Sequence, residues 1–372
     1  MSADPARTAA FHILLEVETG GYASDLLHAR TANLDPRDAG LASELVFGVL
    51  RFRAQLDFIL SRLTKGKLDL EVRTILRMGI YQLRYLDRIP PHAAVSTSVE
   101  LVKRARKRSA AGLVNAVLRK VDRDPVAWPD RATRLCQPEW LLAGWERQFG
   151  AGVAERIARA FLAPPETYVR AAAPSPGLEP TGIPGCYRVT GAVPAGLRIQ
   201  DIGSQSIVPL LELAPGQTFL DLCAAPGNKT AQALESGVDC VACDLHLRRL
   251  RELRRLGCGL VVLDAARPLP FRRLFDRILV DAPCTGSGTL GRNPEIKWRL
   301  APSAPAELHG LQQSILRNAL GALKPGGRLV YSTCSLESEE NEAVVAPFCV
   351  VRTERRLPGL QPGDGFFAAV LA

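Results

Sequence analysis

Apolar segments that alternate with helical segments dominate the sequence from about residue 201 onward. Each apolar segment has the length and composition of a buried strand, and helix-forming residues lie between most of them. This alternation predicts a mostly parallel sheet with helices packed on it, and ligands of such sheets bind at the carboxyl ends of the strands. The expected strands lie in TFLDLCAAPG, VDCVACDL, CGLVVLDA, DRILVDAPC and GRLVYSTCS, and the final FFAAVLA is a further candidate.

Residues 1 to about 125 have the pattern of an all-helical bundle. In SELVFGVLRFRAQLDFILSRL and VRTILRMGIYQLRYL, apolar residues recur every three or four positions, as on one face of a helix. A further stripe follows in AAGLVNAVLRKV, after a break at IPPH. Residues 126–200 are rich in proline, and we interpret them as a connector with two short helices and one candidate strand in ETYVRAAA.

Composition narrows the functional classes only slightly. The 372 residues carry a formal net charge of +9, which weakly favours a polyanionic partner. Positive charge concentrates in KRARKR at 103–108, which is either a solvated helix face or a patch that contacts phosphates. The sequence has no apolar run long enough to cross a membrane and no signal-peptide core, so we expect a cytoplasmic protein with no membrane partner.

Three successive predicted strands end on aspartates, namely Asp221, Asp244 and Asp264. The first strand runs into DLCAAPGNKT, a glycine-containing turn that leads into a helix, as at the nucleotide site of a Rossmann-type sheet. The pyrophosphate fingerprint G-x-G-x-x-G is absent, which disfavours a dehydrogenase. Asp244 suits the two hydroxyls of a ribose, and Asp264 suits an adenine amino group. Taken singly, each aspartate is better explained as a helix cap or turn residue, but three in succession favour a ligand.

Two of the nine cysteines, Cys284 in DAPC and Cys334 in STCS, also end predicted strands. One such cysteine is most simply a small buried hydrophobe, whereas two suggest chemistry. Cys240 and Cys243 form C-x-x-C, but residues three apart on a strand face opposite sides, and no histidine has metal-ligand spacing, so we expect no metal. An odd cysteine count favours free thiols. We interpret four others as small buried hydrophobes, namely Cys136, Cys186, Cys258 and Cys349, and Cys223 as a structural residue of the loop after the first strand.

Longer motifs identify a family. DLCAAPGNKT, VDAPCTGSGTLGRNPEIKWR and YSTCSLESEENE resemble motifs of the RNA cytosine-5 methyltransferases of the Sun/Fmu type. RDAGLASELVFGVLRFRAQLDFIL and IPPHAAVSTSVELVK resemble the NusB-like domain at the N-terminus of that family, and GDGFFAAVLA resembles its last strand. The resemblance implies a multidomain α + α/β fold, with a NusB-like RNA-binding bundle over 1–125, a connector with a reduced RNA-binding subdomain over 126–200, and a Rossmann-like class I methyltransferase domain over 201–372.

The same resemblance implies S-adenosylmethionine as cofactor and a single-stranded or looped cytosine of small-subunit (16S) ribosomal RNA as substrate. Cys334 would be the nucleophile that adds to carbon 6 of the base, and Cys284 would assist product release. Asp281 would position the base and help protonate it, and Lys229 would orient it. We expect a monomer. The implied cofactor-binding residues are Cys223, Ala224, Ala225, Pro226, Gly227, Asn228, Lys229, Asp244, Asp264 and Asp281.

The chain departs from the family pattern in three ways. Asn228 stands where the family has glycine, and we expect the turn to survive because asparagine tolerates left-handed backbone. The connector and the loops between the strands are also short. The segment RNPEIKWR at 292–299 is either a surface segment with one packed tryptophan or an RNA contact, and its place after the Cys284 loop favours the RNA contact.

Two other functional classes compete with this interpretation. A non-catalytic RNA-binding or assembly protein would use only the bundle, and the presence of Cys334, Cys284 and Asp281 argues against it. A nicotinamide-dependent oxidoreductase would share the type of sheet, but the missing glycine fingerprint and the two strand-end cysteines disfavour it. Cofactor binding separates the first alternative from an enzyme.

Overall fold

A computed structural model describes residues 4–272 and 274–372, so residues 1–3 of the expected helical domain lie outside the described residues. The chain forms two compact units. The first holds the residues up to Ala143, together with Phe161–Ala163 and Leu290–Arg299. The second holds Gly144–Ala160, Pro164–Thr289 and Leu300–Ala372. The expected domain boundaries near residues 125 and 200 therefore stay predictions, because the contacts divide the chain in an interleaved way.

The first unit is a helical bundle, as the sequence predicts. Helices α1 and α3 both begin with an aspartate cap followed by proline, and the Asp35 carboxylate accepts the backbone N–H groups of Arg37 and Asp38. This arrangement satisfies the first unpaired N–H groups of the helix. The helices are α1 Pro5–Glu18, α2 Ala23–Thr31, α3 Pro36–Arg51, α4 Arg53–Leu63, α5 Leu70–Tyr85, α6 Pro91–Arg104, α7 Ala111–Leu118 and α8 Arg131–Leu135.

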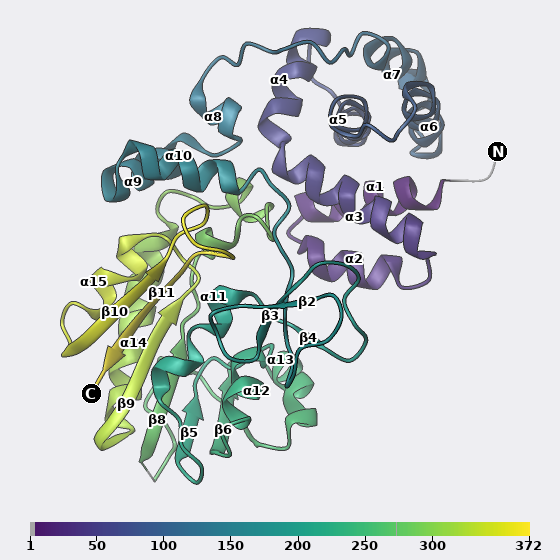
Figure 1. The fold of residues 1–372 in the computed structure, drawn as a ribbon. Helices are drawn as coiled ribbons and strands as arrows, with labels where there is room; N and C mark the ends of the chain where they lie inside the picture. The colour runs from purple at the N-terminus through teal and green to yellow at the C-terminus, as the bar shows by residue number, and fades with distance from the viewer. Residues whose placement is uncertain (1–3, 273) are drawn as a thin grey trace. The chain divides into compact units, whose positions relative to one another are not determined.

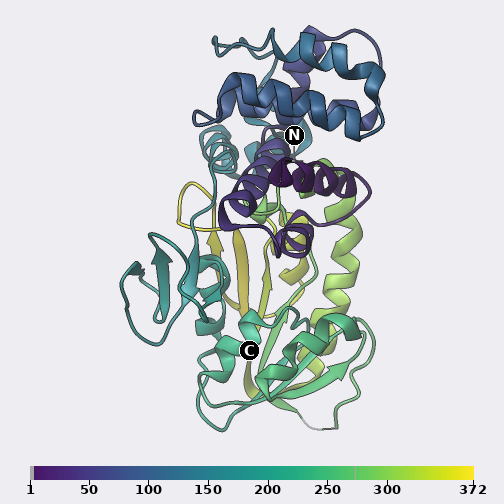
Figure 2. The ribbon, with the colours of Figure 1, turned by 90° about the vertical axis from the view of Figure 1, so that its right-hand side faces the viewer.

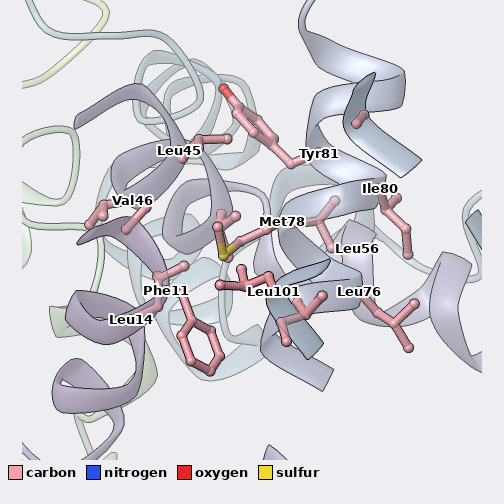
Figure 3. Close-up of a cluster of buried hydrophobic side chains, with 14 of the residues drawn as sticks. Phe11, Leu14, Leu45, Val46, Leu56, Leu76, Met78, Ile80, Tyr81 and Leu101 are labelled. Carbon is pink, nitrogen blue, oxygen red and sulfur yellow. The ribbon is translucent and has the colours of Figure 1, made fainter. Parts of the chain in front are cut away.

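Helix α5 forms the centre of the bundle, because nearly every side chain from Val72 to Leu83 is buried. Figure 3 shows Met78 and Tyr81 of α5 gathered with apolar side chains from neighbouring helices. Gly48 of α3 makes room for this packing, since a Cβ there would lie 2.0 Å from Cζ of Tyr81. The predicted continuous stripe over 43–63 is broken into α3 and α4 at Phe52, whose ring stacks on Tyr85 with ring centroids 4.6 Å apart.

The segment Leu290–Arg299 packs inside the helical unit. Lys297 is only 1% exposed, and its Nζ donates to the carbonyl of Arg51 at 3.1 Å. Desolvation lowers the pKa of Lys297 to about 7. The indole Nε1 of Trp298 donates to the carbonyl of Leu50 at 2.7 Å, and Glu295 accepts the N–H of Ala23 at 3.0 Å. The expected RNA contact is therefore wrong for Lys297, which is used as a structural anchor.

The second unit contains a small antiparallel sheet in the order β2-β3-β1-β4. The candidate strand in ETYVRAAA is confirmed as β1. The other three strands were not predicted, because strands of two to four residues between prolines and glycines show no clear alternation. Their bounds are β1 Tyr168–Arg170, β2 Leu178–Pro180, β3 Cys186–Val189 and β4 Arg198–Ile199.

A seven-stranded sheet in the order β10-β11-β9-β8-β5-β6-β7 forms the core of the second unit (Figure 1). The β7-β6-β5-β8-β9 part is parallel, whereas β11 pairs antiparallel with both β9 and β10. The predicted mostly parallel, Rossmann-like sheet is confirmed. The strands are β5 Thr218–Asp221, β6 Asp239–Asp244, β7 Gly259–Val262, β8 Phe275–Asp281, β9 Leu323–Thr333, β10 Val350–Arg356 and β11 Phe366–Leu371.

Helices cover both faces of this sheet because its strands are apolar on both sides. Ile278 and Val280 of β8 pack with Leu316 of α14, while Leu279 faces the cluster that contains Ala233 of α12. Figure 2 shows α14 running along one face. The helices of this unit are α9 Glu139–Phe149, which begins in the first unit, α10 Ala151–Ala160, α11 Ile202–Gln205, α12 Asn228–Leu234, α13 Leu247–Leu250, α14 Ala304–Gly321 and α15 Glu342–Val345. Among the described residues, no helix is long and apolar enough to span a bilayer.

Candidate active site

The loop between β5 and α12 lines a pocket at the carboxyl edge of the sheet. Its tight turn depends on Gly227, which has φ +99° and whose missing Cβ would lie 2.8 Å from Cγ of Leu253. Asn228 is the first residue of α12, so the turn forms with Asn228 present, as expected, and Gly227 is the residue in the left-handed conformation. The residues that line the pocket are Ser204, Asp221, Cys223, Ala224, Ala225, Pro226, Asn228, Lys229 and Asp281.

Asp221 contributes a carboxylate oxygen that lacks a partner. The residue is 1% exposed, and its Oδ2 accepts the hydroxyl of Thr230 at 2.7 Å. Its Oδ1 is buried and has no hydrogen-bond partner among the described residues. Burial raises the pKa of Asp221 to about 7, partly offset by the Thr230 hydrogen bond. A buried acceptor of this kind fits a ligand that brings a donor or a positive charge.

Asp244 and Asp264 each hold the turn that follows their strand. The Asp244 Oδ1 accepts the N–H of His246 at 2.8 Å, and its Oδ2 accepts the N–H of Ala225 at 3.3 Å. The Asp264 Oδ1 accepts the N–H of Ala266 at 3.0 Å. Both carboxylates therefore have the turn role that competes with ligand binding, and Asp244 also ties the pocket loop to the end of β6. Their cofactor contacts stay predictions.

Asp281 links the pocket to the neighbouring strand. It ends β8 opposite Ser332 of β9, and its Oδ1 accepts the Ser332 hydroxyl at 2.8 Å. Its Oδ2 accepts a hydrogen bond from Nζ of Lys229 at 2.7 Å, and the two groups form an ion pair. Burial alone would lower the pKa of Lys229, but the charge and hydrogen bond of Asp281, together with smaller contributions from Cys334 and Asp221, raise that pKa overall. Lys229 is therefore a cation in the free protein, and the negative charge of a Cys334 thiolate would stabilise it further.

The two strand-end cysteines meet beside this ion pair. The Sγ atoms of Cys284 and Cys334 lie 3.4 Å apart, within hydrogen-bond distance for sulfur. Both side chains are partly buried. The hydrogen bond with Cys334, together with burial, raises the pKa of the Cys284 thiol. The pair therefore holds one thiol protonated while leaving the other next to the Lys229 cation.

The other cysteines behave largely as expected. Cys240 and Cys243 pack into clusters on opposite faces of the sheet, so the C-x-x-C pair is not a chelate. Cys136 and Cys186 are buried, whereas Cys349 is exposed, so its interpretation as a buried residue is wrong. No group of three metal-ligating side chains occurs in the part of the chain that the structure describes.

Comparison with known proteins defines the class. The family model described as 16S rRNA methyltransferase RsmB/F matches residues 208–366, and the NusB family model matches residues 4–123. The solved structure of PH0851 shares the fold, with a TM-score of 0.82 at 22% identity over 100% of this chain and 98% of that one. Fold, pocket and family model together define an S-adenosylmethionine-dependent ribosomal RNA methyltransferase with a NusB domain.

Curated relatives narrow the class to one family. The chain is 39% identical to the ribosomal RNA small subunit methyltransferase B of Thermus thermophilus, over 97% of this chain and 92% of the relative. It is 33% identical to the protein of that name from Klebsiella pneumoniae, over 95% of each chain. The chain belongs to the ribosomal RNA small subunit methyltransferase B family.

The pocket fits the cofactor of this class. S-adenosylmethionine carries a methionyl ammonium group, and the unpartnered Oδ1 of Asp221 offers a buried acceptor for it. Ser204 was not predicted to bind the cofactor. Asp221 was counted among the three strand-end aspartates that favour a ligand, but it was not assigned to the cofactor. Ser204 could not have been predicted, because it reaches the pocket from α11, outside any recognisable motif.

We predict that cofactor binding depends on the ionisation of Asp221. Its carboxyl group has a raised pKa of about 7, so it becomes protonated below that pH and loses its attraction for an ammonium group. Affinity should then fall about tenfold per pH unit as the pH drops from about 7 to 5.5. Calorimetric titration should show this slope for the parent chain.

The Asp221→Asn variant should bind the cofactor more weakly and with little pH dependence over the same range. Asp239→Asn is the matched control. It removes an exposed aspartate at the start of the neighbouring strand β6 and should retain the parent slope. A parent affinity that stays constant over the range would contradict the role of Asp221.

Proposed function

We propose that the chain methylates carbon 5 of a cytosine in small-subunit ribosomal RNA through a covalent adduct between Cys334 and carbon 6. The observation that carries this proposal is the 3.4 Å separation of the Cys284 and Cys334 sulfur atoms. The thiols lie at the ends of the adjacent strands β8 and β9, and Asp281 at the end of β8 lines the cofactor pocket. A single reactive thiol would not need a second one at contact distance.

The chemistry explains why a thiolate is needed. Carbon 5 of cytosine is a poor nucleophile, and addition of the Cys334 thiolate to carbon 6 converts the ring to an enamine whose carbon 5 can attack. S-adenosylmethionine supplies an electrophilic methyl group on sulfur. The thiolate is the reactive form of a cysteine, and Lys229 places a positive charge near Cys334.

Release reverses the addition. The proton on carbon 5 leaves, its electron pair restores the ring double bond, and the bond between carbon 6 and the Cys334 sulfur breaks. We propose that Cys284 loses its own thiol proton to solvent after the adduct has formed, accepts the carbon 5 proton as a thiolate, and so returns to the thiol form. Its raised pKa makes its thiolate a strong base.

Asp281 and Lys229 are proposed to hold the base. The Asp281 carboxylate accepts hydrogen bonds from Lys229 and Ser332, so it is placed as an acceptor for the amino group of cytosine. Lys229 would then supply the proton for ring nitrogen 3, and the Asp281 carboxylate would pass it from Lys229 to the base. Asp244 and Asp264 are proposed to hold the ribose and adenine of the cofactor, as the family resemblance implies.

The helical unit is proposed to bind RNA, with the protein acting as a cytoplasmic monomer. Within KRARKR, Lys103 pairs with Glu100 at 2.7 Å and Lys107 pairs with Asp69 at 2.8 Å. Arg106 and Arg108 are exposed. The segment therefore combines a salt-bridged face with arginines available to phosphates.

We predict that Cys334→Ala abolishes methylation, by at least a thousandfold, because the group that adds to carbon 6 is removed. Transfer of a tritiated methyl group to 16S ribosomal RNA measures the rate. Cys349→Ala, which removes an exposed thiol, is the control and should leave the rate unchanged. Appreciable methylation by the Cys334 variant with an unchanged fold would refute the covalent mechanism.

We also predict that Cys284→Ala accumulates a protein–RNA adduct, because addition proceeds while release is blocked. A denaturing gel should show a slowly migrating species that requires the cofactor and that disappears in the Cys284→Ala/Cys334→Ala double variant. If the single variant turns over freely without such a species, Cys284 has no role in release.

A further inference from the structure

A buried carboxylate, Glu340, lies behind the two cysteines. Glu340 ends the short 3-10 helix η6 Ser338–Glu340 that follows the Cys334 loop, and it is 0% exposed. Its backbone carbonyl accepts the hydroxyl of Tyr331 at 2.7 Å, which fixes η6 against β9. None of the steps proposed above uses this side chain.

The Glu340 carboxylate bonds to the residue that follows each cysteine. Its Oε1 accepts the backbone N–H of Thr285 at 2.8 Å, and its Oε2 accepts the Thr285 hydroxyl. The same Oε2 accepts the hydroxyl of Ser335. Thr285 follows Cys284 and Ser335 follows Cys334, so one carboxylate ties together two loops that are 50 residues apart in sequence.

Gln312 of α14 adds a fourth donor. Its Nε2 donates to Oε1 of Glu340 at 3.1 Å and to the carbonyl of Pro283, the residue before Cys284, at 2.9 Å. An ionised carboxylate only accepts hydrogen bonds, and four donors converge on this one. Such full satisfaction is what allows a buried charge to be stable, and it leaves the loops little freedom.

We propose that Glu340 is a positioning residue that fixes the Cys284 and Cys334 loops against each other and so sets the contact between the two thiols. The inference rests on the proposed roles of those cysteines. The negative charge of Glu340 also contributes to the raised pKa of Cys284, in the same direction as the hydrogen bond with Cys334 and burial. Lys229 places a positive charge near Cys334, so charges of opposite sign act on the two thiols.

The test is Glu340→Gln, which keeps the shape but directs an amide NH₂ at hydrogen-bond donors. Phenylarsine oxide reports the thiol geometry independently of catalysis, because it condenses with two adjacent thiols and releases water. The part of its binding that disappears in Cys284→Ala measures this pair. We expect Glu340→Gln to weaken that part at least tenfold and to lower kcat at least tenfold, with the cofactor Kd and the KM for RNA changed less than about twofold.

Two further variants keep the test decisive. Glu339→Gln changes the exposed neighbour on the same helix and should match the parent in every assay. If Glu340→Gln fails to fold, Ser335→Ala removes one arm of the same contact and should give a smaller loss in the same direction. Parent-level arsenical binding and kcat in Glu340→Gln would overturn the proposal. Loss of the covalent mechanism itself would show instead as methylation by Cys334→Ala.

A separate surface carries arginines without acidic partners. Between Leu247 and Leu256 the chain forms α13 and the 3-10 helix η3 Arg251–Leu256, with Leu250 and Leu253 buried as anchors. The arginines of this segment are all exposed, and within the described residues none of them forms an ion pair with an acid. This arginine surface consists of Arg248, Arg249, Arg251, Arg254 and Arg255.

Arg198 of the small antiparallel sheet adds to the positive charge of this surface, because it interacts electrostatically with Arg255. Burial, together with the charges of Arg170 and Arg255, lowers the pKa of Arg198 in β4, although Glu235 opposes them. The Nη1 of Arg198 is buried without a hydrogen-bond partner. Clustered guanidinium groups repel one another unless an anion lies between them, and their planar fork matches a phosphate.

We infer that the arginine surface binds phosphates of the RNA backbone. This also rests on RNA being the substrate, but its readout is binding and does not depend on the methylated atom. The triple variant Arg251→Gln/Arg254→Gln/Arg255→Gln should bind a short single-stranded RNA oligonucleotide more weakly. The slope of log Kobs against log salt concentration should become shallower by about 0.7 for each phosphate that the protein no longer neutralises, about 2 in all.

Arg156→Gln/Arg317→Gln/Arg352→Gln, which neutralises exposed arginines elsewhere in the same unit, is the matched control and should retain the parent slope. An unchanged slope in the first triple variant would overturn the inference. So would loss of binding to phosphatidylglycerol vesicles with RNA binding intact, because the surface would then serve a membrane.

Discussion

Strand β8 pairs in parallel with β5 on one side and with β9 on the other, and the site depends on this pairing. Parallel strands end at the same edge of a sheet, so this pairing brings the ends of three distant segments together. The cofactor loop follows β5, Asp281 and Cys284 follow β8, and Cys334 follows β9. The order of the strands also reverses direction between β5 and β8, where a crevice opens in this type of sheet.

An ion pair and a single buried carboxylate then organise the groups that this edge collects. On the pocket side, Lys229 and Asp281 form an ion pair that reaches Ser332 on the next strand. Glu340 bonds to Thr285 and Ser335 and so joins the loops that carry the two thiols. A buried charge is tolerated only when its partners are complete, so each one makes its surroundings rigid. The reactive sulfur atoms thus belong to loops whose polar contacts are complete.

Much of this arrangement could be predicted from the sequence. The parallel strands have strong apolar patterns, and their terminal aspartates and cysteines are visible by eye. Edge strand β10 was missed because VVRTERR is charged and largely exposed, so it lacks the apolar signal of a strand. Phe52 divides a helical stripe without any glycine or proline to mark the break. The basic composition of 292–299 predicted that Lys297 contacts RNA, but composition does not show that its side chain is buried.

The contacts around Glu340 could not be predicted for a different reason. Acidic residues after a strand usually begin a helix, and Glu337 to Glu340 have that pattern. Whether one of them turns inward depends on Thr285 and Gln312, which belong to other elements. The unpaired oxygen of Asp221 is likewise a property of the packed pocket. Sequence patterns report the face on which a residue lies, whereas the satisfaction of its hydrogen bonds requires the tertiary structure.

The segment Leu290–Arg299 packs in the helical unit, and this has a consequence for biosynthesis. A ribosome makes the eight N-terminal helices first, and domains generally fold in that order as they emerge. Here the bundle lacks the carbonyl and indole contacts of Lys297 and Trp298 until the chain has been made past Arg299. The first unit to be synthesised is therefore completed only after most of the second has left the ribosome.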